Sequence, residues 1–392
     1  MVSMKALVCD IGNQEWATSR GFELRDIVVP VLNELQNSAD ADFVIIKVNY
    51  AGVCGSDRGI WYRNAFRNQI LESVAKQDAS KQYRIMGHEF FGEIIARGSN
   101  VGNINIGDGV SCESHVICNQ CYQCLRGEKH VCTNEKILGI SYDGAFAEFI
   151  KVPAHIIWKT DISKIRPEVA AIQEPFGNAV HAASKVDLKG KTVAIFGLGP
   201  IGMFFALIAK VSGAKMVIGV EPNPRSAEMA KKLGIDHVIL LRDDANAVAR
   251  TAKNYVHNTE VIDEIMRMTN GVGVDVSFEM AGFNSSVNNC LYATRRGGDI
   301  ILFGIKNEDA VLEDYNRIIV RGYTLHCVIG RQIWKTWETT RSLLEDKNNG
   351  IQEKIFNVIL NGGIDTIIPI TEYTKEAFEK KMATYPKILI KF

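Results

Sequence analysis

The segment Thr192–Gly202, TVAIFGLGPIG, determines how the second half of the chain should fold. Its apolar start, 193–196, has the length of a buried strand, and its glycines form G-x-G-x-x-G. The apolar stretch 203–211 that follows has the length of a helix. In such a strand–turn–helix unit the glycines permit a tight turn, close approach of a pyrophosphate and close packing of the helix. The segment therefore predicts a dinucleotide-binding βαβ unit. The alternative is a tightly packed unit without a ligand.

The acidic residue Glu221 indicates which dinucleotide this unit would bind. It follows a second predicted strand, 215–220, about 20 residues after the glycines, where a carboxylate suits the ribose hydroxyls of NAD. Arg225 lies nearby and could favour a 2′-phosphate, but the carboxylate of Glu221 would repel that group. The sequence therefore predicts NAD rather than NADP.

Strands and helices alternate from residue 191 onward, which predicts a doubly wound parallel sheet of the Rossmann type. The expected strands are 192–197, 215–220, 236–241, 274–278, 299–303 and 323–328. The expected helices are 202–212, 224–233, 259–269, 285–295 and 312–320. The earlier part of the chain instead shows short strands at 5–9, 43–50, 92–96, 109–112 and 147–152. We therefore expect a β-rich, barrel-like domain over 1–165 and a Rossmann domain over 166–330. A terminal segment, 331–392, should return to the first domain.

The composition excludes several classes of protein. The chain has 392 residues, 45 basic and 45 acidic, so its zero net charge argues against a nucleic-acid binder. The near-apolar run 193–209 approaches the length of a membrane span, but three glycines and a proline favour the βα unit. No secretory signal is visible in residues 1–10, and nine cysteines, an odd number, argue against a disulfide framework. We therefore expect a cytoplasmic protein that does not span a membrane.

Four closely spaced cysteines predict a structural metal site. Cys118, Cys121, Cys124 and Cys132 can supply four thiolates, which close a tetrahedral zinc shell and leave no open position. An iron–sulfur cluster is the competing interpretation, because thiolates also hold such clusters.

A second group of possible zinc ligands is spread more widely. Cys54, His88 and Glu89 each have an ordinary explanation, as a small buried side chain, a core histidine and a solvated carboxylate. Together, beside a dinucleotide-binding unit, they favour a metal site. Glu174 opens a predicted helix, 176–184, where the helix dipole alone would also favour an acidic residue.

The order of these motifs resembles the zinc-containing medium-chain alcohol dehydrogenases over nearly the whole chain. The motifs are Cys54-Gly-Ser-Asp57, Gly87-His88-Glu89, the four-cysteine segment and the central GLGPIG. Within that family, the segments 114–118, 173–181 and 330–337 are similar to the threonine dehydrogenase subgroup. The resemblance implies an α/β protein with a GroES-like catalytic domain beside the Rossmann domain.

The resemblance also implies roles for individual residues. Cys54, His88, Glu89 and Glu174 would bind a catalytic zinc ion. Asp57 would hold the imidazole of His88, Ser56 would relay a proton, and His115 would line the substrate pocket. The implied cofactor contacts are Gly197, Gly199, Pro200, Ile201, Gly202, Glu221, Arg225, Gly304, Ile305, Val328 and Ile329.

The implied activity is oxidation of a secondary alcohol by hydride transfer from a zinc-bound alkoxide to NAD. The expected substrate is L-threonine, the product 2-amino-3-oxobutanoate, and the assembly a homotetramer by analogy. A polyol or sugar dehydrogenase is the alternative with the same fold. A zinc-bearing nucleic-acid module and a quinone-type reductase with only the structural zinc are less consistent with the motifs.

The sequence departs from the threonine dehydrogenase pattern at two places. Extra residues, 71–82, lie between Cys54 and His88, and we expect a helix or loop that could change substrate choice. Ser226 stands where that subgroup usually carries an arginine, and Arg225 precedes it.

Overall fold

The computed structural model describes residues 2–12, 16, 19–77, 80–241, 255–306 and 309–392. The chain divides into two compact units, which are described separately below. Unit 1 consists of Met1–Pro175, Gln332–Lys347 and Ile355–Phe392, and unit 2 of Phe176–Arg331 and Asn348–Lys354. Within the described residues, no helix is both long enough and apolar enough to cross a bilayer.

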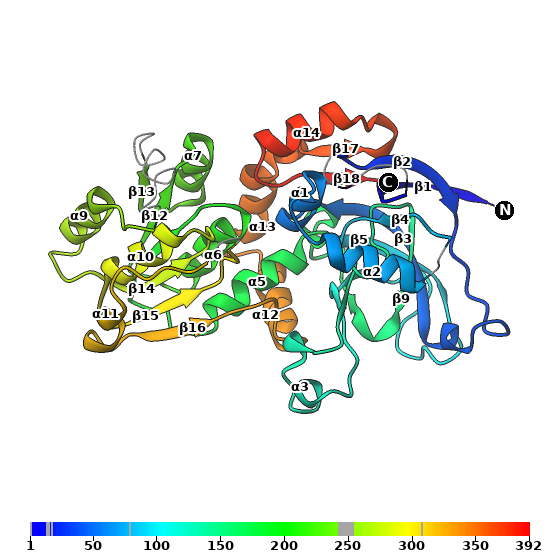
Figure 1. The fold of residues 1–392 in the computed structure, drawn as a ribbon, viewed down its shortest axis with the longest axis horizontal. Helices are drawn as coiled ribbons and strands as arrows, with labels where there is room; N and C mark the ends of the chain where they lie inside the picture. Colours follow the sequence, from blue (N-terminus) through cyan, green and yellow to red (C-terminus); the bar gives the residue numbers. More distant parts are fainter. Residues whose placement is uncertain (1, 13–15, 17–18, 78–79, 242–254, 307–308) are drawn as a thin grey trace. The chain divides into compact units, whose positions relative to one another are not determined.

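Unit 1 is built on β-sheets, as the sequence predicts. The main sheet has the strand order β10-β6-β5-β3-β18-β17, and β9 also pairs with β3 (Figure 1). Its strands are β3 (Phe43–Gly52), β5 (Glu89–Arg97), β6 (Gly109–Cys112), β9 (Phe149–Pro153), β10 (Ile157–Lys159), β17 (Ile367–Pro369) and β18 (Leu389–Lys391). A second sheet contains β2 (Glu23–Val28), β1 (Ser3–Asp10) and β4 (Tyr83–Ile85) in that order.

The late strand β18 lies inside the main sheet and not at its edge. It pairs antiparallel with β3, where Leu389 is opposite Gly52, and parallel with β17. Leu389 and Ile390 are almost completely buried. A segment near the end of the sequence is therefore part of the core formed by the beginning of the chain.

Several helices complete unit 1. They are α1 (Gly55–Trp61), α2 (Arg67–Gln77), α3 (Tyr122–Leu125), α4 (Pro167–Ala170), α12 (Lys335–Glu345) and α14 (Lys375–Thr384). The fully buried ring of Trp61 packs between Phe22 and Phe378, with ring centroids 5.1 Å away in each case. Aromatic pairs at this distance gain energy beyond the burial of their area, so this cluster fixes α1 against α14.

Helix α2 contains most of the extra residues 71–82, so the helical alternative is confirmed for residues up to Gln77; residues 78 and 79 lie outside the described part. Ile70 and Val74 are buried in the core of unit 1 because they lie four residues apart on one face of the helix. The buried guanidinium of Arg84 donates to Gln77 Oε1 and Ser73 Oγ, at 2.9 Å each, and to Asp143 Oδ1 at 3.0 Å. The extra segment is thus a packed element and not a loose loop.

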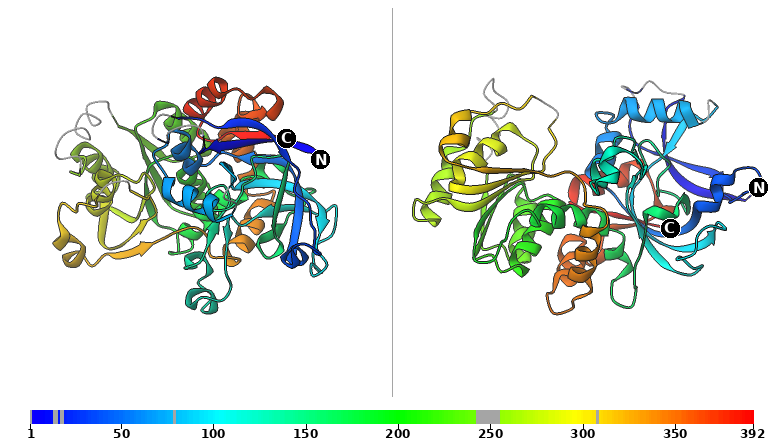
Figure 2. Two further views of the ribbon diagram at one scale, coloured as in Figure 1. Left: turned by 45° about the vertical axis from the view of Figure 1, so that its right-hand side comes forward. Right: turned by 90° about the horizontal axis from the view of Figure 1, so that it is seen from below.

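Unit 2 is a six-stranded parallel sheet of the Rossmann type, which confirms the predicted fold class. The order β13-β12-β11-β14-β15-β16 is the Rossmann order, with β11 as its first strand. The strands are β11 (Thr192–Phe196), β12 (Met216–Glu221), β13 (His237–Leu240), β14 (Val274–Glu279), β15 (Thr294–Leu302) and β16 (Thr324–Cys327). Figure 2 shows the sheet with helices on both sides. The helices of unit 2 are α6 (Pro200–Val211), α7 (Pro224–Leu233), α9 (Thr259–Met268), α10 (Asn284–Ala293), α11 (Tyr315–Val320) and α13 (Ile351–Lys354), and α5 (Gln173–Ala183) belongs to unit 2 from Phe176 onward.

The two largest differences from the predicted element boundaries in unit 2 have local reasons. Strand β15 begins at Thr294 and not at 299, because it continues through Gly297, which adopts a φ of 65°, with a register shift against β14. Helix α11 begins at Tyr315 and not at 312, because Asp314 caps it by accepting a hydrogen bond from the amide of Arg317.

We expect Ile70→Ala to lower the free energy of unfolding by about 2–5 kcal/mol, because it leaves a cavity beneath α2. Glu72→Ala, on the exposed face of the same helix, should change it by less than about 0.5 kcal/mol. Denaturant unfolding of both variants measures the difference. Equal values for the two would mean that α2 does not belong to the core.

Candidate active site and metal sites

The glycine-rich turn between β11 and α6 has the geometry that its sequence predicts. Gly197 adopts a φ of 100°, which only glycine reaches without strain. A Cβ on Gly202 would lie 2.1 Å from the carbonyl oxygen of Gly197, so this position needs a glycine for packing. A Cβ on Gly199 would meet nothing within 4 Å. Gly199 therefore leaves space beside the start of α6, where free amides and the helix dipole favour a phosphate group.

The carboxylate of Glu221 lies beside this turn. Its Oε2 accepts a hydrogen bond from the Leu198 amide at 2.7 Å, and its Oε1 accepts one from the Asn223 amide at 2.9 Å. Burial raises the pKa of Glu221, while these two amides act in the opposite direction. The carboxylate is thus held by backbone groups at the end of β12, as a ribose-binding acid would be.

The other predicted cofactor contacts lie at several places in unit 2. Pro200 and Ile201 begin α6, and Arg225 is an exposed residue in the first turn of α7. Val328 and Ile329 follow the carboxyl end of β16, and Gly304 and Ile305 follow that of β15. A Cβ on Gly304 would lie 2.4 Å from the amide nitrogen of Gly282, so this glycine is needed for backbone packing. Ile305 is 79% exposed, which leaves its side chain accessible.

The structure brings three predicted metal ligands together in unit 1. One ligand atom each from Cys54, His88 and Glu89 lies within 4.8 Å of the others. Cys54 precedes α1, and His88 directly precedes Glu89, the first residue of β5, which pairs with the end of β3. The Oγ of Ser56 lies 3.4 Å from His88 Nε2, so the hydroxyl predicted to relay a proton is next to this group.

Asp57 is buried beside His88, but the predicted hydrogen bond between them is not formed. Asp57 Oδ1 lies 3.9 Å from His88 Nδ1, which is too far for a hydrogen bond although close enough for attraction between charges. Asp57 Oδ2 instead accepts a hydrogen bond from the Cys54 amide at 2.9 Å, within the turn that begins α1. In this structure, Asp57 therefore fixes the Cys54 backbone and acts on His88 through its charge.

Negative charge is concentrated around His88. Burial favours the neutral imidazole, but Asp57, Cys54 and Glu174 together raise the pKa of His88 to about 10. Glu174, at the start of α5, thus lies near enough to act on this ring, although it is outside the set of ligand atoms within 4.8 Å. The donor set fits a zinc ion, because a divalent cation would neutralise the same charges that hold a proton on the ring.

Sequence reasoning missed Lys387, which lies next to this group. Its ammonium is only 2% exposed, forms an ion pair with Glu89 Oε2 and donates to the carbonyl oxygen of Val53 at 3.1 Å. Lys387 enters the site because β18, just after it, pairs with β3. The apolar residues 388–390 that follow Lys387 were the available signal, but their pairing with β3 was not visible in the sequence.

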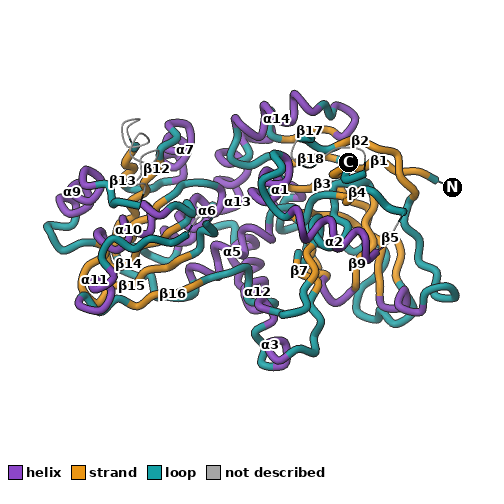
Figure 3. Tube along the Cα trace, viewed as in Figure 1, coloured by secondary structure: helices purple, strands orange, loops and turns teal. Residues whose placement is uncertain are grey.

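The four predicted cysteines come together in a lobe of unit 1 that contains α3, with β7 (His115–Val116) at its neck (Figure 3). The sulfur of Cys132 lies 3.5 Å from that of Cys118 and 3.8 Å from that of Cys121. These separations are far beyond a disulfide bond and close to the roughly 3.8 Å edge of a tetrahedron around zinc. Hydrogen bonds from Thr133 and the Cys124 backbone lower the pKa of Cys121 to about 5. The lobe therefore fits a structural zinc ion.

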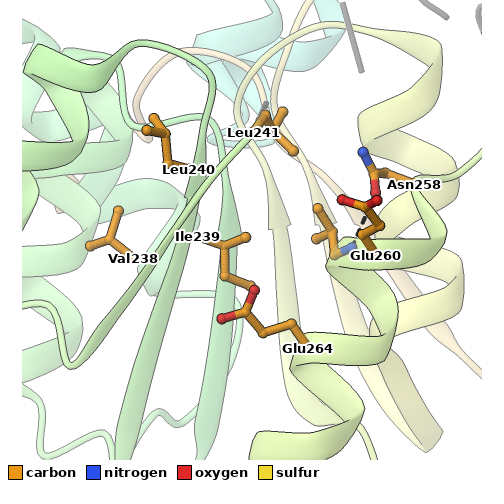
Figure 4. Close-up of a pocket in the computed structure, with 8 residues that line it drawn as sticks. Val238, Ile239, Leu240, Leu241, Asn258, Glu260 and Glu264 are labelled. Carbon is orange, nitrogen blue, oxygen red and sulfur yellow. Dashed lines mark hydrogen bonds between the residues drawn. The ribbon is translucent and has the colours of Figure 1, made fainter. Parts of the chain in front are cut away.

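A pocket of about 170 Å³ in unit 2 is separate from these groups (Figure 4). Its lining includes Ile239, Leu240 and Leu241 at the end of β13, and Glu260 and Glu264 on α9. Two carboxylates make this pocket unsuitable for the phosphates of a dinucleotide.

Two family models match the chain. The alcohol dehydrogenase GroES-like domain matches residues 40–162, and the zinc-binding dehydrogenase domain matches residues 200–346. A protein from Caldanaerobacter subterraneus named L-threonine 3-dehydrogenase is 35% identical over 335 residues, which is 85% of this chain and 87% of the relative. The chain belongs to the zinc-binding alcohol dehydrogenase family. The resemblance inferred from the motifs is thereby confirmed, and the chain is an enzyme of this family that oxidises an alcohol.

Other members of the zinc-binding alcohol dehydrogenase family show similar agreement. A protein from Pyrococcus horikoshii, also named L-threonine 3-dehydrogenase, is 38% identical over 302 residues, 77% of this chain and 80% of the relative. The crystal structure of 2R,3R-butanediol dehydrogenase from Bacillus subtilis is similar with a TM-score of 0.76 and 24% sequence identity, covering 100% of both chains. That similarity supports the fold.

We expect Gly199→Ala and Gly202→Ala to separate cofactor binding from folding. The first should weaken NAD binding by tenfold or more while changing stability by about 1 kcal/mol or less, because its Cβ enters space that is otherwise open. The second should destabilise the fold, because its Cβ collides with the backbone of Gly197. Calorimetric titration with NAD and thermal unfolding measure the two effects. Unchanged NAD affinity in a folded Gly199→Ala variant would contradict a phosphate site at this turn.

Proposed function

We propose that this enzyme oxidises L-threonine at its 3-hydroxyl group with NAD, and that the product is 2-amino-3-oxobutanoate. The observation that carries the proposal is the group of Cys54, His88 and Glu89 in a chain that aligns over 85% of its length with a relative named L-threonine 3-dehydrogenase. Unit 1 would then be the catalytic part and unit 2 the dinucleotide-binding part.

Two zinc ions would be bound in unit 1. The catalytic ion would be held by Cys54, His88, Glu89 and Glu174, and the structural ion by the four cysteines of the lobe. The catalytic zinc supplies positive charge that makes a nearby hydroxyl easier to deprotonate. The glycine-rich turn and Glu221 would hold NAD, which would supply the hydride acceptor.

The residues of this chain would orient the substrate and move its proton. The hydroxyl of Ser56, which lies 3.4 Å from His88 Nε2, would accept the proton of the substrate alcohol and pass it towards solvent. Asp57 and Glu174 add negative charge near His88, which favours a bound cation at this position. Glu221 would accept hydrogen bonds from the ribose in exchange for those from the backbone.

A polyol or sugar dehydrogenase is the second candidate, and the packed helix α2 favours it. In the sequence, this helix lies between Cys54 and His88, two of the proposed metal ligands. Its fixed position in unit 1 means that it could change which alcohol enters.

The substrate is tested by following NAD reduction with L-threonine beside a panel of polyols and simple secondary alcohols. We expect turnover of L-threonine that is lost in Cys54→Ser, because one metal ligand is removed, and greatly reduced in His115→Ala. Turnover of a polyol with none of L-threonine would reject the proposed substrate and favour the second candidate.

Metal analysis tests the two zinc sites. We expect two zinc ions per chain in the wild type and one in Cys54→Ser and in Cys124→Ser, with a lower melting temperature in the second variant because the lobe loses its centre. Cys327→Ser is the matched control, because this exposed cysteine belongs to neither group and should retain both ions. Iron in place of zinc at the lobe would instead favour the iron–sulfur interpretation.

A further inference from the structure

Glu113 is a completely buried carboxylate between two residues that the proposed reaction and the family motifs single out. It follows β6 directly, and its own amide donates to the carbonyl oxygen of Ile156 at 2.9 Å, so its backbone is fixed. Its Oε1 lies 3.0 Å from Nδ1 of His115 and 3.2 Å from the backbone nitrogen of that residue. Its Oε2 accepts a hydrogen bond from Nε1 of Trp337 at 2.8 Å. A buried carboxylate is costly without partners, and here both oxygens have one.

These contacts determine which ring nitrogen of His115 carries the hydrogen. An ionised carboxylate only accepts hydrogen bonds, so the Nδ1 atom that faces Glu113 must carry the hydrogen. In the neutral ring, the acceptor is then Nε2, the nitrogen on the far side. Ser114 Oγ lies 3.4 Å from the same Nδ1, and Glu135 Oε2 lies 3.9 Å from Nε2.

Trp337 fixes the carboxylate in turn. The indole is 1% exposed and lies on α12, where it packs near Trp158 and Trp334 with ring centroids 5.6 Å and 6.0 Å away. An indole N–H is a donor only and cannot change its role, so it holds one oxygen of Glu113 in a constant direction. The other oxygen is thereby directed at His115.

The four-cysteine lobe is joined to the strand that carries His115. His115 lies on β7, which pairs with β8 (Lys136–Ile137), and this two-stranded ribbon joins the lobe to the rest of unit 1. Ile333 and Trp334, just before α12, pack against Cys124 and Cys132 of the lobe. The ribbon carries His115, Glu113 contacts its ring, and α12 holds Glu113 through Trp337.

We propose that Glu113 is a positioning residue that, held by Trp337, keeps His115 in the Nδ1–H tautomer and presents Nε2 as an acceptor to the substrate. This inference rests on the proposed function for the identity of the substrate. The ammonium group of an amino alcohol can only donate hydrogen bonds, so it needs an acceptor at Nε2, whereas the hydroxyl of a diol can donate or accept and would bind either tautomer.

The tautomer is measured directly by long-range ¹⁵N–¹H correlation spectra of the histidine rings in the zinc-loaded enzyme. The chain has eight histidines, and the signal of His115 is assigned by its loss in His115→Gln. We expect the Nδ1–H pattern in the wild type and its loss or mixing in Glu113→Gln. A carboxamide offers one acceptor and one donor and cannot accept from both His115 and Trp337.

A second substitution distinguishes a changed tautomer from a folding defect caused by Glu113→Gln. In Glu113→Gln combined with Trp337→Phe, the carboxamide oxygen can face His115 without opposing the indole, so the Nδ1–H pattern should return. Glu135→Gln is the matched control, because it removes the other nearby carboxylate and should leave the pattern unchanged. An Nδ1–H pattern that persists in folded Glu113→Gln, or that is lost in Glu135→Gln, would overturn the inference.

Kinetics connects the tautomer with the reaction. We expect kcat/KM for L-threonine to fall about tenfold to a hundredfold in Glu113→Gln and to recover partly in the double variant. A wild type inactive with L-threonine would remove the proposed function but leave the spectroscopic test of Glu113 intact. An active wild type with identical kinetics and tautomer in Glu113→Gln would overturn the role of Glu113 and leave the proposed function standing.

Discussion

The burial of several acidic side chains around one imidazole is the constraint on which unit 1 depends. Asp57, Glu89 and Glu174 are each at most 5% exposed, and Cys54 lies among them, so removal from water is costly unless positive charge is near. Lys387 supplies part of that charge through its ion pair with Glu89. Breaking a buried pair of this kind costs about 3–5 kcal/mol, so the position of β18 and the chemistry of the site are linked.

Unit 2 was predictable because its signals are local. Its strand–turn–helix signal lies within twenty consecutive residues, from β11 through the glycine-rich turn to α6. The apolar run predicts the strand, the glycines predict the turn, and the apolar stretch after them predicts the helix. Gly197 needs its positive φ and Gly202 its missing side chain whatever the rest of the chain does. The boundaries of β15 and α11 were less predictable, because a register shift and a capping aspartate depend on particular contacts.

The candidate site in unit 1 was predictable only in part. The possible ligands were visible as residue types, and the structure brings Cys54, His88 and Glu89 together. Their partners were not visible, because Lys387 reaches Glu89 across 298 residues of sequence and Trp337 reaches Glu113 across 224. Hydrophobic periodicity predicts that a strand or helix exists, but it does not specify which buried polar atom will face it.

The place of β18 in the main sheet also governs when unit 1 can be completed during synthesis. During synthesis on the ribosome, Cys54, His88 and Glu89 emerge in the first quarter of the chain, long before β18. Until residues 387–391 have emerged, β3 lacks one neighbour and Glu89 lacks its buried cation. The nascent chain must therefore keep three reactive ligands in an incomplete sheet while all of unit 2 is made. The main sheet of unit 1 is completed only after the whole of unit 2 has been synthesised.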